Sequence, residues 1–362
     1  MTTYLDANST TFMSQSTIDF MTKWTNKGDS REKYQTALEC KKLISSFKNQ
    51  IILECGLNSS DEFKIIITNS ASEANILFIK NCIESYAAIT TLLPHIIIGS
   101  NEHESITELC KYLEINKLCQ ITILQNHINI KGEYSTIELE DAIKPNTCLI
   151  SISSTNYSGV IHNLKELSYI AKKAKIPLHT DAVQLFSRTI FHPIAMGIDA
   201  FSANFHKMHG PSGIGILVVV KNLIDGYKLN LKTYNIQNIP AVAGAFLSFK
   251  QMIENRLEKN LNLLKMKKIF IEAISTEIET SYIEDNVNSP IVWHFPKDLS
   301  MSLSNTVLFT CSEYGDKTLF TTLEENDIIV NGQKNKIRVS FSDNTTIEDI
   351  KHIIKIILNY FK

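Results

Sequence analysis

Short runs of β-branched residues alternate with amphipathic segments between about residue 60 and residue 220, and this alternation constrains the fold more than any other feature of the chain. Each run has the pattern of a strand that is buried on both faces. The runs are residues 64–67, 95–98, 121–124, 148–152, 176–179 and 214–220. Apolar residues at helical spacing lie between several of them, for example Leu164, Leu167, Ile170 and Ala171. The pattern predicts an α/β fold with a mostly parallel central sheet and helices on both faces.

The pattern changes after about residue 240. A long helix-like stretch over residues 241–277 precedes a hydrophilic region, strand candidates at residues 306–309 and 337–341, and a final helix over residues 347–360. We therefore predict three parts. Residues 1–15 form an N-terminal segment that packs near the site, residues 16–240 form a large α/β domain, and residues 241–362 form a small α+β C-terminal domain.

Charge and hydropathy exclude several classes of protein. The chain has 36 Lys and Arg against 38 Asp and Glu, so it has no basic excess with which to bind nucleic acid. Its apolar runs are far shorter than the roughly 20 residues of a membrane-spanning helix. The first residues lack the basic and apolar regions of a signal peptide. We therefore expect a cytoplasmic protein that binds neither nucleic acid nor membrane.

The cysteines do not form a recognisable framework. There are seven, an odd number, and none forms a CxxC pair, which argues against both a disulfide scaffold and a zinc site. We expect most of them to be small buried side chains. His206 and His209 could imitate a pair of metal ligands, but no third ligand accompanies them, so no metal is expected.

Residues 68–73 form a turn of small residues between a predicted strand and a predicted helix. Such a turn leaves backbone N–H groups free at a helix N-terminus, where the helix dipole favours a phosphate. A simpler interpretation is that Ser70 or Ser72 caps the helix and Glu73 supports its first turn.

Asp181 follows directly on a predicted buried strand, at the carboxyl end, where open α/β sheets bind ligands. A buried carboxylate is costly unless it is paired, which favours a functional role. The alternative is that Asp181 caps the next helix.

Lys207 lies in a stretch of apolar and small residues, before a glycine-rich turn. It is either a solvent-facing loop lysine or a desolvated amine able to attack a carbonyl and form a Schiff base. The glycines 210, 213 and 215 precede a strand and do not open a helix, so they are not a dinucleotide fingerprint. The chain also has no GxSxG motif of a serine hydrolase.

The three segments, taken together, indicate a single kind of binding site. Pyridoxal 5′-phosphate requires N–H donors for its phosphate, a carboxylate for its pyridinium nitrogen and an amine for its aldehyde. The turn at residues 68–73, Asp181 and Lys207 supply these groups in that order. We therefore predict a pyridoxal phosphate site.

With these residues in place, the chain resembles the fold-type-I pyridoxal phosphate enzymes of the class V aminotransferase group, and among them the NifS-like cysteine desulfurases. The resemblance covers nearly the whole chain. It rests on residues 4–11 (YLDANSTT), 68–75 (TNSASEAN), Glu102-His103, Asn156 with Gly159, 179–184 (HTDAVQ), His206-Lys207, 210–213 (GPSG) and 337–340 (IRVS).

The resemblance implies a role for each matching residue around the cofactor. Lys207 is the Schiff-base lysine, Asp181 pairs with the pyridine nitrogen, and His103 stacks on the ring unless it is only a solvated loop histidine. Gln184 bonds the ring hydroxyl. The phosphate is held by Ala71, Ser72, Asn204 and His206, where Asn204 replaces the serine usual in the family.

Two further residues are implied to contact the substrate. Asn156, beside the cofactor, and Arg338 would bind the substrate carboxylate, Arg338 as a two-pronged clamp. Arg338 could instead form a surface salt bridge on a strand. The freed Lys207 or His103 would then move a proton at the α-carbon of the substrate.

The chain departs from the family in two places. In the desulfurases, a loop just before the segment matching residues 337–340 carries the cysteine that accepts sulfur. Here residues 329–336 run almost directly into Ile337, and they contain no cysteine. Cys311 is not in register with that loop. The family's threonine that reaches the neighbouring subunit's phosphate is replaced by Ile236, which has no hydroxyl.

These observations predict a pyridoxal phosphate-dependent, cysteine desulfurase-like enzyme that acts on a small amino acid through an external aldimine. Without the loop cysteine, we expect a route other than persulfide formation. A homodimer is expected. The alternative is a degenerate, non-catalytic relative that acts as a binding or scaffold subunit.

Overall fold

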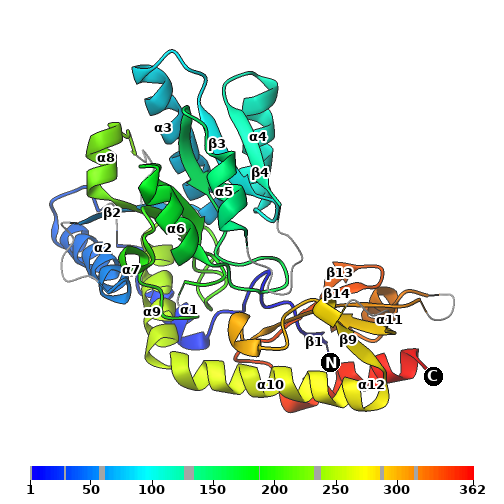
Figure 1. The fold of residues 1–362 in the computed structure, drawn as a ribbon. Helices are drawn as coiled ribbons and strands as arrows, with labels where there is room; N and C mark the ends of the chain where they lie inside the picture. Colours follow the sequence, from blue (N-terminus) through cyan, green and yellow to red (C-terminus); the bar gives the residue numbers. More distant parts are fainter. Residues whose placement is uncertain are drawn as a thin grey trace.

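The structure is a computed structural model that describes residues 2–27, 30–56, 62–125, 134–186, 188–231, 238–285, 289–313 and 317–362. Figure 1 shows two lobes, with the sheet and the shorter helices of the large lobe above and a smaller lobe along the long helix α10 below. The first residues of the chain run between the two lobes and join the small one (Figure 1).

A seven-stranded sheet forms the centre of the large lobe, in the order β2-β8-β7-β6-β5-β3-β4. Its strands are β2 (Phe63–Thr68), β3 (His95–Gly99), β4 (Gln120–Leu124), β5 (Thr147–Ser151), β6 (Leu178–Asp181), β7 (Ala200–Asn204) and β8 (Gly215–Val220). Only β8 runs antiparallel to its neighbours; the other pairs are parallel. The expected α/β fold with a mostly parallel sheet is confirmed.

Helices cover both faces of this sheet, which explains why its strands are apolar on both sides. One core contains Phe47 of α2, Leu167 of α6 and Phe249 of α9, and the other contains Phe78 of α3 and Ile106 of α4. The helices are α1 (Gln15–Thr22), α2 (Gln35–Glu54), α3 (Ala71–Ile89), α4 (Glu104–Ile115), α5 (Thr136–Ala142), α6 (Leu164–Lys173), α7 (Pro193–Met196), α8 (Lys221–Tyr227) and α9 (Ile239–Glu254).

The small lobe has its own sheet and core. Its sheet has the order β13-β14-β11-β10-β9, and Phe270, Trp293, Phe309 and Ile353 pack together in its core. The short strand β1 (Thr3–Tyr4) pairs with β12 (Ile328–Ile329). The other elements are α10 (Arg256–Glu277), β9 (Thr280–Tyr282), β10 (Ile291–Trp293), β11 (Thr306–Cys311), α11 (Leu319–Glu325), β13 (Asn331–Gln333), β14 (Lys336–Ser340) and α12 (Ile347–Tyr360), with 3₁₀ turns at Ile283–Asp285 and Leu299–Met301.

The stretch predicted as one long helix over residues 241–277 is two helices, so that prediction is wrong. α9 ends at Glu254, and Asn255 separates it from α10. Val242 and Phe249 of α9 pack in the core of the large lobe, whereas Phe270 of α10 packs in the core of the small one. The core that the chain enters therefore changes at Asn255.

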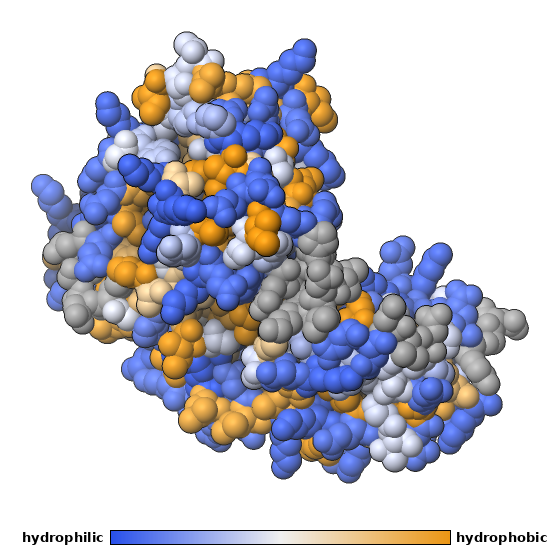
Figure 2. Space-filling model, viewed as in Figure 1, coloured by the Kyte–Doolittle hydropathy of each residue, from blue (hydrophilic) through white to orange (hydrophobic). Residues whose placement is uncertain are grey.

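Two other kinds of site are absent from the described part of the chain. No helix within the described ranges is long and apolar enough to span a membrane. Those ranges also contain no group of three or more His, Cys, Asp or Glu side chains that could hold a metal ion. Figure 2 shows a mainly hydrophilic face with hydrophobic residues gathered over part of α10, the helix that carries the exposed Leu257 and Leu261.

Candidate active site

The residues predicted to form the site gather at one edge of the central sheet. Strands β2, β3, β5, β6 and β7 all end there, since β8 is antiparallel to its two neighbours. Gly215 of β8 lies opposite both Thr68 of β2 and Asn204 of β7, and Asp181 lies opposite Ser202. The segments after these strands therefore meet in space, as expected for a ligand site of an open α/β sheet.

Lys207 lies just beyond β7 and is half-buried. No described residue is within hydrogen-bond or ion-pair distance of its Nζ. Burial lowers the pKa of Lys207 to about 8, and the Asp181 carboxylate opposes this shift. The positive charges of Arg188 and Arg338 lower that pKa further. Lys207 is thus an unpartnered amine that loses its proton readily, which favours the nucleophile interpretation over the solvent-facing one.

Asp181 ends strand β6 and is buried. Its Oδ2 accepts a hydrogen bond from Asn75 Nδ2 (2.9 Å), and its Oδ1 accepts one from the backbone N–H of Val183 (3.0 Å). Both oxygens are therefore held in place. The alternative, that Asp181 caps the next helix, does not hold, because the next described helix, α7, begins at Pro193. The bond from Val183 closes a local turn, and the charge of the Asp181 carboxylate still acts on the Lys207 amine.

His103 connects to Asp181 through two intermediate side chains. Asn75 Nδ2 also donates to Ser105 Oγ (3.2 Å), and Ser105 Oγ lies 2.9 Å from His103 Nδ1. His103 is exposed and caps α4, because its Nδ1 accepts the backbone N–H of Ser105. This leaves its Nε2 without a partner among the described residues. A ring at this place can cover a ligand that faces Asp181.

The N-terminus of α3 forms the cradle predicted for an anion. Ser70 caps this helix by accepting the N–H of Glu73 (3.0 Å), so the capping role is confirmed. The N–H groups of Ala71 and Ser72 belong to the first turn and have no acceptor within the helix. A side chain at Gly215 would place its Cβ 2.4 Å from the carbonyl carbon of Ser70, so only glycine lets the turn pack here.

Asn204 and His206 face this cradle from β7 and the loop after it. Asn204 Nδ2 lies 2.9 Å from His206 Nε2, and the Oδ1 of Asn204 is buried with no partner within the described ranges. Burial, with the charge of Lys207, lowers the pKa of His206 to about 4, so its ring is neutral. If His206 Nε2 carries the proton, the Asn204 amide turns over and its NH₂ group becomes free to bond an anion.

In both Asn156 and Gln184, only one of the two polar atoms of the side-chain amide has a hydrogen-bond partner among the described residues. Asn156 Oδ1 accepts bonds from Ser158 and Val160, while its Nδ2 has no partner among the described residues. Gln184 Nε2 donates to the backbone carbonyl of Asn8 (2.9 Å), and its buried Oε1 has no partner among the residues described. The expectation for Ile236 lies outside the described residues.

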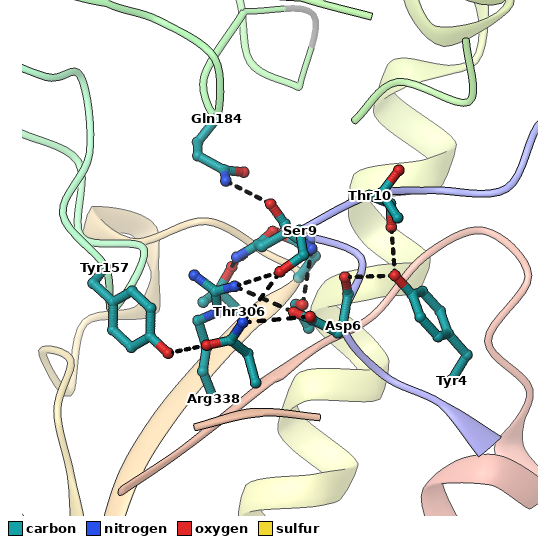
Figure 3. A network of polar contacts seen from close by, with 12 residues as sticks. Tyr4, Asp6, Ser9, Thr10, Tyr157, Gln184, Thr306 and Arg338 are labelled. Atoms are coloured by element: carbon teal, nitrogen blue, oxygen red, sulfur yellow. Dashed lines mark hydrogen bonds and ion pairs between the residues drawn. The ribbon is translucent and has the colours of Figure 1, made fainter. Parts of the chain in front are cut away.

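Arg338 on β14 is buried rather than on the surface. Its Nη2 lies 3.2 Å from Asp6 Oδ1 and also donates to Ser9 Oγ (3.2 Å). The ring of Tyr157 covers the guanidinium, with its centroid 4.4 Å from Cζ (Figure 3). The Nε of Arg338 is buried and has no hydrogen-bond partner in the part of the chain that the structure describes.

Sequence reasoning missed Asn75, Asp6, Tyr157 and Arg188. Asn75 carried a signal, because it is a polar residue on the face of α3 that buries Ala74 and Phe78. The buried Arg188 donates to Asn8 Oδ1 (2.7 Å) and to the backbone carbonyl of Lys207 (3.3 Å), which no local pattern indicated.

The sequence and the fold are similar to those of known proteins. Residues 3–239 match the aminotransferase class-V family. The cysteine desulfurase IscS of Clostridium botulinum (strain Hall) is 28% identical over 90% of this chain and 79% of its own. That of Dictyoglomus turgidum is 27% identical over 83% of this chain and 75% of its own. A solved NifS-like protein superposes with a TM-score of 0.84 and 21% identity, covering 100% of this chain and 99% of the other.

The fold is that of the fold-type-I pyridoxal phosphate enzymes. The chain belongs to the aminotransferase class-V family. The curated relatives to which it is similar over most of its length are cysteine desulfurases.

The residues present fit pyridoxal phosphate. Unpartnered polar groups converge at the sheet edge, where Lys207 Nζ, Asn204 Oδ1 and Gln184 Oε1 lack described partners. The first-turn N–H groups of α3 suit a phosphate, and Asp181 suits a protonated ring nitrogen. The donor set thus matches each part of the cofactor.

Proposed function

We propose that this chain is a pyridoxal phosphate-dependent enzyme that acts on a small amino acid, with cysteine as the first candidate substrate. One observation carries the proposal: a half-buried lysine amine without a described partner, with a pKa of about 8, lies at the same edge of the sheet as a carboxylate whose two oxygens are held in place and whose charge acts on that amine. The proposal has two further parts: a homodimer, which the family resemblance implies, and a cytoplasmic location.

Each residue has a defined task in this proposal. When bound, the cofactor withdraws electrons from the α-carbon of an amino acid. Lys207 would attach it and move a proton at that carbon, while Asp181 would keep the ring nitrogen protonated. Ala71, Ser72, Asn204 and His206 would hold the phosphate, His103 would cover the ring, and Gln184 would bond its hydroxyl. Asn156, beside the cofactor, and Arg338 would bind the substrate carboxylate.

We further propose that the reaction does not pass through a persulfide on this chain. The segment before Arg338 forms the tight hairpin of β13 and β14, in which Asn331 lies opposite Arg338. Cys311 lies at the end of β11, and burial raises the pKa of its thiol to about 12. The other six cysteines are buried too, and burial also raises the pKa of each of their thiols. A thiolate able to accept sulfur is therefore disfavoured.

Product analysis tests the proposal. The purified protein, loaded with pyridoxal phosphate, is incubated with L-cysteine, and sulfide, pyruvate, ammonia and alanine are measured. Elimination converts cysteine and water into equal amounts of sulfide, pyruvate and ammonia, whereas transfer of sulfur to an enzyme thiol releases alanine. We expect the first set of products. Selenocysteine and alanine complete the substrate panel.

Two variants serve as controls. Lys207→Ala should abolish product formation and covalent cofactor attachment, whereas Cys311→Ala should leave both unchanged. Alanine release that Cys311→Ala abolishes would show a persulfide route. A protein that neither binds the cofactor nor changes any amino acid would favour the scaffold alternative.

A further inference from the structure

The buried Arg338 is already bound to an internal carboxylate. Its Nη2 pairs with Asp6 Oδ1 and donates to Ser9 Oγ, each at 3.2 Å (Figure 3). Asp6 reaches this position because its backbone lies beside β14, where Leu5 O accepts the N–H of Ser340 (2.8 Å). The pair is thus built by the N-terminal segment, on the strand that carries the expected substrate clamp.

This arrangement occupies the nitrogen that a two-pronged clamp needs. A guanidinium offers a carboxylate two edges, Nε with Nη2 and Nη1 with Nη2, and Nη2 belongs to both. Asp6 and Ser9 together use this shared nitrogen. The remaining donors, Nε and Nη1, do not share an edge. A substrate carboxylate can therefore form a two-pronged bond only if Asp6 or Ser9 gives way.

The neighbouring side chains prevent Arg338 from turning to a free edge. Tyr157 stacks on one face of the guanidinium, and its hydroxyl donates to Asn331 Oδ1. Asn331 Nδ2 in turn donates to Ser9 Oγ (3.2 Å) and lies 3.4 Å from Asp6 Oδ2. These contacts hold both Arg338 and Asp6 in place. A substrate carboxylate can therefore compete for the guanidinium only by replacing the Asp6 carboxylate.

We propose that the Asp6 carboxylate competes with the substrate carboxylate for Arg338, so that an amino acid binds by displacing Asp6. This rests on the proposed function, since it concerns how the same site takes its amino acid. The internal competitor lowers the affinity for any single carboxylate and couples substrate binding to the N-terminal segment, where Asn8 bonds Gln184 and Arg188.

Asp6→Asn tests this competition, with the exposed Asp19→Asn as the matched control. Proteins loaded with pyridoxal phosphate are titrated with L-alanine and with ethylamine, which has no carboxylate, while the cofactor absorbance is followed. Removing the competing charge should tighten L-alanine binding by about tenfold or more and leave ethylamine binding within about twofold. Unchanged or weaker L-alanine binding by Asp6→Asn would overturn the proposal, since Asp6 would then only position Arg338.

A second measurement does not depend on the proposed reaction. Acetate, compared with chloride at equal ionic strength, should raise the thermal unfolding midpoint of Asp6→Asn more than that of the wild type. The double variant Asp6→Asn with Arg338→Gln should lose this difference. If no protein responds to L-alanine but the acetate effect follows this pattern, the proposed function fails and the competition stands. If acetate does not raise the unfolding midpoint of Asp6→Asn more than that of the wild type, the proposed competition is wrong.

A third variant tests the competition even if Asp6→Asn does not fold. Ser9→Ala keeps the ion pair and frees one hydrogen of Nη2. It should tighten L-alanine binding by less than Asp6→Asn does. A larger effect of Ser9→Ala would contradict the assignment of Asp6 as the main competitor.

Discussion

Lys207 shows how a single residue acquires its chemistry from its surroundings. Removal from water favours the neutral amine, and the nearby arginines add to this effect. Asp181 and Asp6 act in the opposite direction. The net result is a pKa of about 8, below the ordinary value of 10.5, and close to the range in which a lysine can serve as both nucleophile and base.

The lowered pKa of Lys207 predicts a pH dependence for cofactor attachment. The neutral amine is the nucleophile, so the rate of covalent attachment of added pyridoxal phosphate should rise through about pH 8 and level off above it. Mass spectrometry after borohydride reduction measures the attachment. Asp181→Asn should move the midpoint to lower pH, because the Asp181 charge raises the pKa of Lys207. A midpoint near that of an ordinary lysine would contradict the assignment.

At the scale of elements, the site depends on how α3 packs against the edge of the sheet. The turn between β2 and α3 lies over Gly215, the first residue of β8. The close approach of the two backbones brings the N-terminus of α3 next to Asn204, which lies opposite Gly215. The N-terminus of a helix binds an anion only where the anion can come close to it. The contact of this turn with Gly215 therefore determines where the anion site lies.

Gly215→Ala should displace the turn that begins α3. Its Cβ would meet backbone atoms of Ser70 and Ala71, which cannot rotate away. We expect a loss of about 1–3 kcal/mol of unfolding free energy, as for overpacking, and weaker cofactor binding. Gly226→Ala on α8, where a Cβ meets nothing within 4 Å, is the matched control. Thermal unfolding and cofactor titration measure both effects; equal behaviour of the two variants would argue against this packing role.

At the scale of the whole molecule, a buried lysine outside the site joins α10 to the segment before β11. Lys267 of α10 is 0% exposed, and its Nζ donates to Ser302 Oγ (2.8 Å) and to the carbonyl of Leu303 (3.1 Å). The same amine lies over the ring of Phe295, 4.6 Å from its centroid. Burial lowers the pKa of Lys267 to about 7.

The lowered pKa of Lys267 predicts how the free energy of unfolding depends on pH. Between about pH 7 and pH 10 the unfolded chain binds the Lys267 proton and the folded chain releases it, so its contribution to the unfolding free energy rises with pH. Lys267→Met should remove this rise, which amounts to at most about 1.4 kcal/mol per pH unit. Denaturant unfolding at pH 7, 8 and 9 measures the slope, with the exposed Lys268→Met as control. An unchanged slope in Lys267→Met would refute the assignment.

The sequence by itself determined the alternation of strands and helices and the residues at the strand ends. Both are local properties, because strand burial follows from short apolar runs, and the carboxyl ends of parallel strands necessarily share one edge. This is why the α/β fold and the neighbourhood of Lys207 and Asp181 could be predicted. The strands β9 and β10 were not predicted, since each has only three residues in a hydrophilic region.

Only the tertiary structure decided which distant side chains pair. The break at Asn255 follows from the different cores that α9 and α10 enter, whereas the apolar pattern continues across both helices. Asp6 and Arg338 are 332 positions apart and meet because the N-terminal segment lies along β14. Periodicity describes neighbours in the chain, while the partner of a buried charge depends on how the whole chain packs.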